Sequence, residues 1–330
     1  MTTARFANLH DLDEIARATG VSGANIDAYV KSAKQASFYT QLKIRKRGRK
    51  RAGQFRIVHK AKHEWLGQLH RMVAAMIGND VTFGSHVQGF IQQRSILTNA
   101  RQHLGARVIL HGDIQGFFDA ITVEQVQRGL VSLGAPPNVA ELLARAGTID
   151  GFLRQGTRCS PAIANLVCRP LDDGLLALAG AHRATYTRYA DDLTFSGEKV
   201  PDAAAVQAIV EQHGFKLRDG RCYLQHRGRS QFVTGLFVGD TQRARLPRRL
   251  KRRLRQILHF VEKFGTDGHF GRPGADALVG DALALAGMIR FVQSIEPGLA
   301  RRLRAQYQTG SEKSWKERED YQDDEPPESD

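Results

Sequence analysis

Apolar residues recur every three or four positions along several long segments of the chain, and this spacing predicts amphipathic helices. The stripe from Trp65 to Met76 is one example. Thr122 and Gln125 form a capping box that predicts the start of another helix, and Gly134 ends it. The predicted helices cover residues 12–18, 22–30, 65–76, 122–133, 160–179, 202–213, 250–264 and 275–294, and a further helix begins near Pro297.

Shorter apolar runs have the length and residue types of strands. They lie at residues 54–58, 107–113 and 231–238, and on both sides of a turn within 185–197. With 330 residues, of which 42% are hydrophobic, the chain is long enough to form a core. We expect two or three subdomains around a shared cleft.

Two adjacent carboxylates lie in the sequence Tyr-Ala-Asp-Asp, residues 189–192. Neighbouring side chains on a regular strand point to opposite faces, so both acids reach one site only if Ala190 and Asp191 form a tight hairpin turn. A solvated Asp-Asp turn is the simpler interpretation of an isolated pair. A third carboxylate argues against it, because Asp113 ends the apolar run of residues 107–113.

A carboxylate at the end of a buried strand needs a cation or hydrogen-bond donors, since an unpaired buried charge is very costly. With Asp191 close to Asp113, the simplest cation is Mg²⁺. Two Mg²⁺ ions about 4 Å apart can lower the pKa of an attacking hydroxyl and hold the leaving oxygen of an in-line phosphoryl displacement. The acids therefore predict phosphoryl-transfer chemistry.

The charge of the chain indicates a polyanionic partner. The net charge is +14, and the last twenty residues hold nine acids against three bases, so the preceding part carries +20. Such a body favours binding to nucleic acid. Seven of the nine residues in 43–51 are basic and precede a predicted strand, and eight of the thirteen in 243–255 are basic within a predicted helix. Arg56, at the strand, is the expected triphosphate ligand.

The chain has three cysteines and no Cys-x-x-Cys pair, which predicts reduced thiols. It has no apolar signal core at its N-terminus and no apolar run of membrane-spanning length. We therefore expect a soluble cytoplasmic protein without a membrane partner. His59 and His63 have a helical spacing that could bind a metal, but no third ligand follows at a zinc-site spacing.

These segments together resemble a reverse transcriptase over about residues 35–260. Asp113, followed five residues later by Phe118, resembles the first catalytic motif with its aromatic steric gate. Residues 154–161 resemble the second motif, and the Tyr-Ala-Asp-Asp sequence resembles the third. In the family, the aromatic gate excludes a ribose 2′-hydroxyl and so selects deoxynucleotides.

Two further matches resemble the reverse transcriptases of bacterial retrons. Asn99-Ala-Arg-Gln-His103 fits their Asn-Ala-x-x-His pattern. Val233-Thr234-Gly235 fits their Val-Thr-Gly, a region implicated in recognising their own structured RNA.

The chain also departs from the family's pattern. Arg154 replaces a usual proline in the second motif, and Arg218 and Arg221 take the places of asparagine and lysine in a later motif. Arginine is a poorer proton donor than lysine, which weakens any general-acid role of Arg221 and leaves its electrostatic role. A proline commonly found soon after the position of Arg56 is absent.

The resemblance implies an α+β fold, a right-hand polymerase with fingers, a palm of antiparallel sheet and helices, and a helical thumb. The expected parts are N-terminal helices and fingers at 1–105, the palm at 106–240, a basic thumb at 241–309, and an acidic disordered tail at 310–330.

The resemblance also implies the site residues. Asp113, Asp191 and Asp192 are expected to be catalytic and to bind two Mg²⁺ ions, for which Mn²⁺ can substitute. The expected nucleotide-binding residues are Arg56, Phe118, Gln155, Gly156, Tyr189 and Arg221. The expected RNA or template-primer ligands are Asn99, His103, Val233, Thr234, Gly235, Arg248, Arg252 and Arg255.

The implied reaction is RNA-directed DNA synthesis from deoxynucleoside triphosphates. In retrons a cognate noncoding RNA is the template and one of its 2′-hydroxyls can prime, and retrons are implicated in antiphage defence with a separate effector protein. One alternative is a group II intron or diversity-generating reverse transcriptase, which would copy any primed RNA. The other is a polymerase-like RNA-binding scaffold that has lost catalysis.

Overall fold

The computed structural model describes residues 5–45, 53–271 and 279–322. The chain divides into two compact units, unit 1 at Met1–Arg229 and unit 2 at Ser230–Asp330. Both helices and antiparallel sheets form the fold, so the predicted α+β class is confirmed. No helix within the described ranges is both long enough and apolar enough to cross a membrane.

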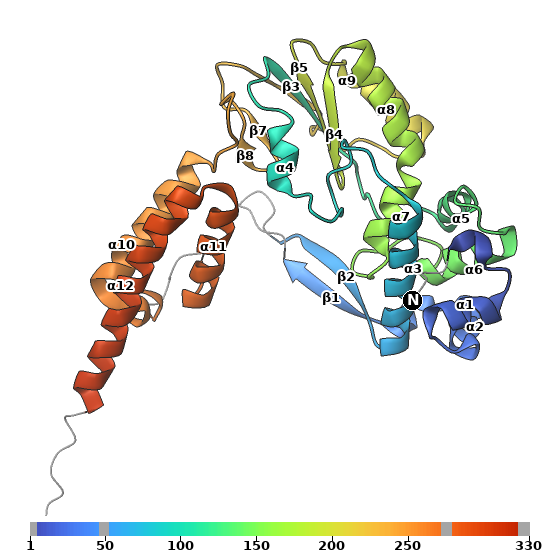
Figure 1. Cartoon of the computed structure of the whole chain (residues 1–330), viewed down its shortest axis with the longest axis horizontal. Helices are drawn as coiled ribbons and strands as arrows, with labels where there is room; N and C mark the ends of the chain where they lie inside the picture. Colours follow the sequence, from blue (N-terminus) through green and yellow to red (C-terminus); the bar gives the residue numbers. More distant parts are fainter. Residues whose placement is uncertain (1–4, 46–52, 272–278, 323–330) are drawn as a thin grey trace, which may run out of the picture. The chain divides into compact units, whose positions relative to one another are not determined.

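Unit 1 is built on a four-stranded antiparallel sheet in the order β4-β5-β3-β6 (Figure 1). Helices α8 and α9 pack against each other, and α8 packs on β4. Leu110, Leu193 and Phe195 of the central strands are buried in the main core. The strands are β3 (Val108–Asp113), β4 (Thr185–Tyr189), β5 (Asp192–Gly197) and β6 (Tyr223–His226), and the helices are α8 (Arg169–Ala181) and α9 (Ala203–Gln212).

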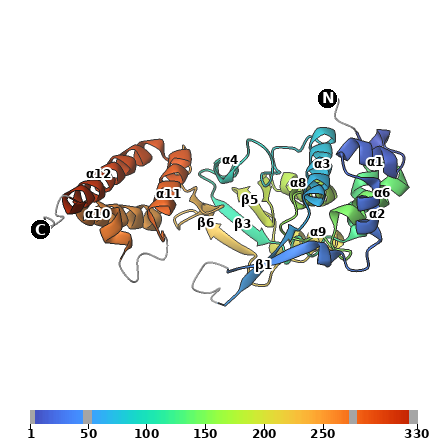
Figure 2. The same ribbon diagram turned by 90° about the horizontal axis from the view of Figure 1, so that it is seen from below.

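A helical layer and a two-stranded hairpin complete unit 1. Helix α3 (Glu64–Asp80) packs on α1, α6 and α7, with α1, α2 and α6 on its far side from the sheet (Figures 1 and 2). The hairpin of β1 (Tyr39–Arg45) and β2 (Phe55–Ala61) is antiparallel. The remaining elements are η1 (Phe6–Asn8), α1 (Leu12–Thr19), α2 (Gly23–Lys31), η2 (Gln35–Phe38), α4 (Ile96–Arg101), α5 (Val123–Val131), α6 (Pro137–Gly147) and α7 (Ser160–Val167).

Unit 2 is mainly helical. Helix α10 (Arg248–Phe270) packs along α12 (Pro297–Gln322), and α11 (Ala282–Ile295) packs on α12. Leu254, Leu258 and Val261 form the buried face of α10, as their helical spacing predicted. A short hairpin of β7 (Phe232–Val233) and β8 (Leu236–Phe237) precedes α10.

Several predicted boundaries differ from the structure. The helix predicted at 160–179 is two helices that meet at Cys168, because Pro170 has no N–H to continue the first one. The strand predicted at 231–238 is the β7-β8 hairpin. The helix predicted from residue 275 begins at Ala282, where Asp281 caps it, and residues 275–278 lie outside the described ranges.

Two charged segments run into residues that the structure does not describe. Residues 46–51 of the predicted basic run lie outside the described ranges, and Lys43 and Arg45 lie on β1. Helix α12 continues to Gln322, past the point near residue 310 where the sequence predicted disorder, and residues 323–330 are outside the described ranges. The sequence from 311 to 322 contains no proline and is rich in Glu, Lys and Arg, which are good helix formers.

Candidate active site

The three predicted acids lie at one end of the central sheet. Asp113 is the last residue of β3, and Asp192 is the first residue of β5. They are direct partners in the antiparallel register. The N–H of Ile114, just after β3, donates to the carbonyl of Asp191 over 2.9 Å. The strand pairing therefore brings the backbones of Asp113, Asp191 and Asp192 to one end of the sheet.

The turn between β4 and β5 has the predicted position. Tyr189 ends β4 and pairs with Asp192 across the turn, so Ala190 and Asp191 form a two-residue connection. Ala190 has φ 57°, in the left-handed region that two-residue hairpin turns require. This turn lets adjacent acids leave the regular alternation of a strand, and the predicted hairpin is confirmed.

The cluster of acids changes the ionisation of Asp192. The Asp192 side chain is reached by solvent, but the protein crowds it on its other sides. Loss of hydration, and then the charges of Asp191 and Asp113, raise its pKa to about 6. Arg218 and Arg221 oppose that rise. Ionising all three acids at once is therefore unfavourable, and a bound cation would make it easier.

Arg218 forms an ion pair with Asp113. Its guanidinium Nη2 lies 3.2 Å from Asp113 Oδ1, and its backbone N–H donates to the Asp113 carbonyl over 2.7 Å. From the sequence, Arg218 was identified only as a departure from the family's pattern. The structure shows that this departure places a positive charge directly on one of the three acids.

The donor set suits a hard divalent cation, because carboxylate oxygens are the ligands that Mg²⁺ and Mn²⁺ prefer. Like charges at Asp191 and Asp113 raise the Asp192 pKa, which is the electrostatic setting that a cation relieves. Within the described ranges, no three His, Cys, Asp or Glu side chains converge closely enough to form a metal site. The carboxylate oxygens of the three acids are suitable ligands for such a cation. Arg218 is paired with one of these oxygens, Asp113 Oδ1.

A buried ion pair supports the hairpin from behind. Arg188, on β4 two residues before Ala190, is fully buried, and Asp172 of α8 accepts from its Nε and Nη2 at 2.8 and 2.7 Å. Arg188 Nη1 donates to Asn165 Oδ1 over 3.0 Å and to the Ala190 carbonyl over 3.4 Å. Burial alone would lower the Arg188 pKa, but the charge of Asp172 raises it overall, so the guanidinium stays charged.

A loop preceding α4 closes over the same hairpin. The N–H groups of Gln88 and Gly89 both donate to the Arg188 carbonyl, and Asn165 Nδ2 donates to the Gly89 carbonyl. A Cβ atom at Gly89 would lie 2.4 Å from the backbone nitrogen of Ala190. Only glycine permits this approach, so the loop is fitted to the turn that carries the acids.

This loop places a second aromatic ring beside Phe118. Phe90 has φ 63°, a strained conformation for a bulky residue, and its side chain is 47% exposed. Its ring centroid lies 6.0 Å from that of Phe118. Arg94 holds the loop by donating to the carbonyls of Phe83, Gly84 and Val87. Phe90 was not predicted from the sequence, since neither its φ nor its neighbours follow from local composition.

The second motif contacts the hairpin that carries Arg56. The N–H of His59 on β2 donates to the Gln155 carbonyl over 2.8 Å. Gly156 has φ 109°, and a Cβ there would lie 2.7 Å from the His59 nitrogen. Arg56 is exposed three residues before His59. Unit 1 therefore brings Arg56, Gln155 and Gly156 to adjoining segments.

The same motif is tied to the segment after Phe118. Arg154 Nη1 lies 2.9 Å from Asp119 Oδ1, and Ser160 Oγ donates to the Arg154 carbonyl. Arg221 lies close enough to influence Asp192. The predicted nucleotide residues thus belong to connected parts of unit 1 around the acids.

The predicted RNA-binding pair at Asn99 and His103 lies inside unit 1. Both residues are 1% exposed. His103 bonds Ser196 Oγ through Nδ1 and Thr187 Oγ1 through Nε2, each at 2.7 Å, and burial lowers its pKa to about 3. Neutral His103 therefore cross-links β4 and β5. Neither side chain is exposed on the surface of unit 1, and direct RNA contact by this pair stays a prediction.

The other predicted RNA ligands belong to unit 2. Val233 is buried, and Thr234 and Gly235 form the β7-β8 turn with φ 46° and 81°. Arg248, Arg252 and Arg255 are exposed on α10. Only Arg255 of these three lines the cavity between α10 and the start of α12.

Comparison with known proteins identifies relatives of this arrangement. Residues 44–226 match the family described as reverse transcriptase (RNA-dependent DNA polymerase). The chain is 34% identical to the retron Mx65 reverse transcriptase of Myxococcus xanthus, and the match covers 77% of this chain and 61% of that protein. It is 32% identical to the retron Mx162 reverse transcriptase of the same organism, over 92% of this chain and 68% of that protein.

A more distant relative is the retron Ec86 reverse transcriptase of Escherichia coli. It is 27% identical, over 77% of this chain and 78% of that protein. The matched family segment contains all three acids of the sheet end, both Phe90 and Phe118, and the second motif.

Proposed function

Because the chain belongs to the reverse transcriptase family, and within it to the retron enzymes, we propose that it is an RNA-directed DNA polymerase. The observation that carries this proposal is the meeting of Asp113, Asp191 and Asp192 at one end of the β3-β5 pair. The proposed reaction is attack of a primer hydroxyl on a deoxynucleoside triphosphate, with release of pyrophosphate.

Asp113, Asp191 and Asp192 are the residues that would hold divalent cations, with Mg²⁺ favoured by their oxygen donors and Mn²⁺ as a substitute. Two bound cations would supply a lower pKa for the attacking hydroxyl and charge stabilisation for the leaving oxygen. The chain's own part is to keep the three carboxylates together. The hairpin turn, the Arg188-Asp172 pair and the Gly89 contact support this role.

Phe118 and Phe90 are proposed to line the sugar side of the incoming nucleotide. Phe118 matches the family's steric gate, and the strained, half-exposed ring of Phe90 extends the same aromatic surface. Backbone strain held by a clamped loop is often kept where it serves a site. Arg56, Gln155, Gly156 and Tyr189 are proposed to surround the same nucleotide, and Arg221 to contribute positive charge near its phosphates.

The division of the chain supports a right-hand polymerase arrangement. We propose that β1, β2 and the N-terminal helices form the fingers, that the four-stranded sheet with its helices forms the palm, and that unit 2 forms the thumb. The boundary between the units at Arg229 favours a palm that ends about ten residues earlier than the sequence suggested. The positive charge of the chain suits a nucleic-acid substrate.

The proposed template is a cognate structured noncoding RNA, with single-stranded DNA as product and deoxynucleotides as substrates. The retron names of the relatives support this proposal. Antiphage defence with a separate effector protein, in the cytoplasm, is proposed on the same basis. A second candidate is an RNA-binding scaffold without catalysis, because Arg218 pairs with Asp113 where a cation would bind.

DNA synthesis by the purified chain on a primed RNA template distinguishes these candidates. We expect labelled DNA from the unaltered chain with Mg²⁺ and deoxynucleotides, and none from Asp113→Asn, because that change removes a charged oxygen ligand. Asp202→Asn is the matched control, since Asp202 caps α9 through its side chain and asparagine caps equally well. DNA synthesis by Asp113→Asn at the level of the unaltered chain would refute the catalytic role.

A further inference from the structure

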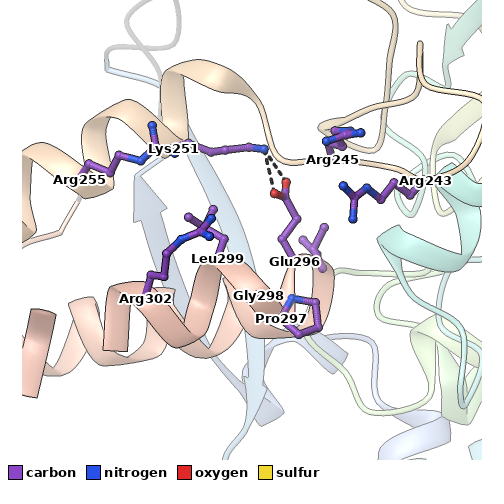
Figure 3. Close-up of a pocket in the computed structure, with 10 residues that line it drawn as sticks. Arg243, Arg245, Lys251, Arg255, Glu296, Pro297, Gly298, Leu299 and Arg302 are labelled. Atoms are coloured by element: carbon purple, nitrogen blue, oxygen red, sulfur yellow. Dashed lines mark hydrogen bonds and ion pairs between the residues drawn. The ribbon is translucent and has the colours of Figure 1, made fainter. Parts of the chain in front are cut away.

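A cavity of about 420 Å³ lies within unit 2, where the segment before α10 meets the first turn of α12 (Figure 3). Its walls carry five cationic side chains and one carboxylate, Glu296. The cationic residues are Arg243, Arg245, Lys251, Arg255 and Arg302. Such an excess of positive charge around one hollow requires an explanation, since like charges repel.

Two of the five cations already have partners that fix the framework of the cavity. Lys251 Nζ lies 2.7 Å from Glu296 Oε1, and the same carboxylate accepts from the Leu246 N–H over 2.8 Å. Arg245 Nε donates to Asp240 Oδ2 over 2.7 Å. The Glu296 contacts join α10 and the segment before it to the residue that precedes α12, and the Arg245-Asp240 pair holds that segment itself, so the wall is held without using the remaining arginines.

Arg243, Arg255 and Arg302 are the remaining cations. Within the described ranges, none of the three guanidinium groups has a carboxylate within 4.0 Å. They come from three different segments, namely the connector before α10, α10 itself and α12, and they line the same hollow (Figure 3). The start of α12, at Pro297 and Gly298, adds the positive end of a helix dipole.

We propose that this cavity binds one phosphate group of a polynucleotide backbone through Arg243, Arg255 and Arg302. Guanidinium forks match the paired oxygens of a phosphate, and the fixed Glu296-Lys251 pair keeps the hollow open beside them. Exposed arginines continue along α10 at Arg248 and Arg252, which favours a polymer over a free phosphate ion. The inference rests on the proposed nucleic-acid substrate and assigns it a discrete contact in unit 2.

The test compares two arginines that carry the same charge. Arg302→Gln removes a cavity arginine, and Arg290→Gln removes an exposed arginine of α11 that does not line the cavity. Affinity of the full chain for a labelled single-stranded RNA oligonucleotide is measured over a series of salt concentrations. We expect Arg302→Gln to weaken binding about tenfold and to reduce the salt slope by about 1, and Arg290→Gln to weaken it several times less.

Two further variants separate charge from geometry. Arg302→Lys keeps the charge and loses the fork, so it should recover only part of the lost affinity. Arg243→Gln should reproduce the loss from the opposite wall. A DNA oligonucleotide of the same sequence should show the same losses if phosphate alone is read, whereas losses confined to RNA would identify the RNA strand as the source of the phosphate.

Equal effects of Arg302→Gln and Arg290→Gln would overturn the inference, because they would show a diffuse charged surface without a discrete site. Unchanged affinity of Arg302→Gln would also overturn it. These outcomes are distinct from failure of the proposed function, which is an absence of DNA synthesis by the unaltered chain on primed RNA. Thermal melting of each variant checks that unit 2 is still folded.

Discussion

Asp192 is the acid whose ionisation depends most clearly on the arrangement of the site. Its pKa is raised to about 6 by lost hydration and by the charges of Asp191 and Asp113. The folded chain therefore holds this proton more tightly than the unfolded chain does. Ionisation of Asp192 costs stability, and that cost develops as the pH rises from about 4 through 6.

The first prediction concerns this cost. In the presence of a chelator, Asp192→Asn should melt about 2 °C above the unaltered chain at pH 7.5, and the difference should shrink toward zero at pH 4.5. Comparing the two proteins at each pH cancels the titration of buried histidines such as His103. A melting difference that is the same at both pH values would show that the pKa of Asp192 is not raised by its neighbours in the folded chain.

The second prediction concerns Phe90. Phe90→Ala should raise KM for deoxynucleotides about tenfold, since one aromatic contact with a nucleoside contributes about 1–3 kcal/mol. Phe90→Tyr should retain most activity. Phe90→Gly should lose as much activity as Phe90→Ala. Its melting temperature should be higher than that of Phe90→Ala, because glycine adopts the left-handed φ without strain.

Leu176→Ala is the matched control for Phe90, since Leu176 is a similarly exposed apolar residue on α8. Unchanged KM in Phe90→Ala, with normal activity, would show that the ring does not meet the nucleotide. The strained backbone at Phe90 would then serve the packing of the loop and not nucleotide binding.

At this scale, the sequence predicted residues whose chemistry is carried by local pattern. The three acids and Phe118 could be found because each stands at the end of an apolar run or at a fixed spacing from one. Phe90, Arg218 and Asp172 could not, because their roles arise from contacts between segments far apart in the chain.

Among the elements, the β4-β5 hairpin depends most on distant support. Its Arg188 is buried against Asp172 of α8, and Asn165 of α7 joins Arg188 to the Gly89 loop. A buried charge without its partner is strongly destabilising. The helices α7 and α8 thus determine whether the turn holds the acids in position.

The third prediction tests that support. Asp172→Ala should lower the free energy of unfolding by about 3–5 kcal/mol, because it leaves the Arg188 guanidinium buried and unpaired. Asp172→Leu combined with Arg188→Met should recover much of that loss, yet DNA synthesis should remain low because the contact with the Ala190 carbonyl is gone. Denaturant unfolding and DNA synthesis are the two measurements.

An exposed ion pair provides the control. Asp27 and Lys31 lie one turn apart on α2, and both side chains are solvent-exposed. Lys31 Nζ is 2.8 Å from Asp27 Oδ2. Asp27→Ala should change stability by less than about 0.5 kcal/mol. A comparable loss in Asp27→Ala and Asp172→Ala would show that burial of the pair does not set its importance.

Element boundaries were predictable where a local signal marks them. The Thr122-Gln125 capping box forms as expected, and so does the apolar face of α10. The break at Cys168 was missed because the apolar spacing of α7 and α8 runs across Pro170. The short strands β6, β7 and β8 were missed or merged, since their pairing partners decide where they begin.

For the whole molecule, charge separates the chain into a basic body and an acidic end. The last twenty residues carry −6, and the rest carries +20. Sequence alone was sufficient to infer the polyanionic substrate from this balance. The boundary between the two compact units, at Arg229, could not be predicted from the sequence, because it depends on which segments pack together.

We propose that this chain makes DNA on its own RNA at the site of Asp113, Asp191 and Asp192. The most direct measurement is to purify the chain from its native host with its bound nucleic acid and to test that material with ribonuclease and deoxyribonuclease. We predict an RNA-DNA species sensitive to both enzymes, which is absent when Asp191→Asn and Asp192→Asn are combined. Bound RNA without DNA in the unaltered chain, or the same DNA in the double variant, would show that these acids do not direct DNA synthesis.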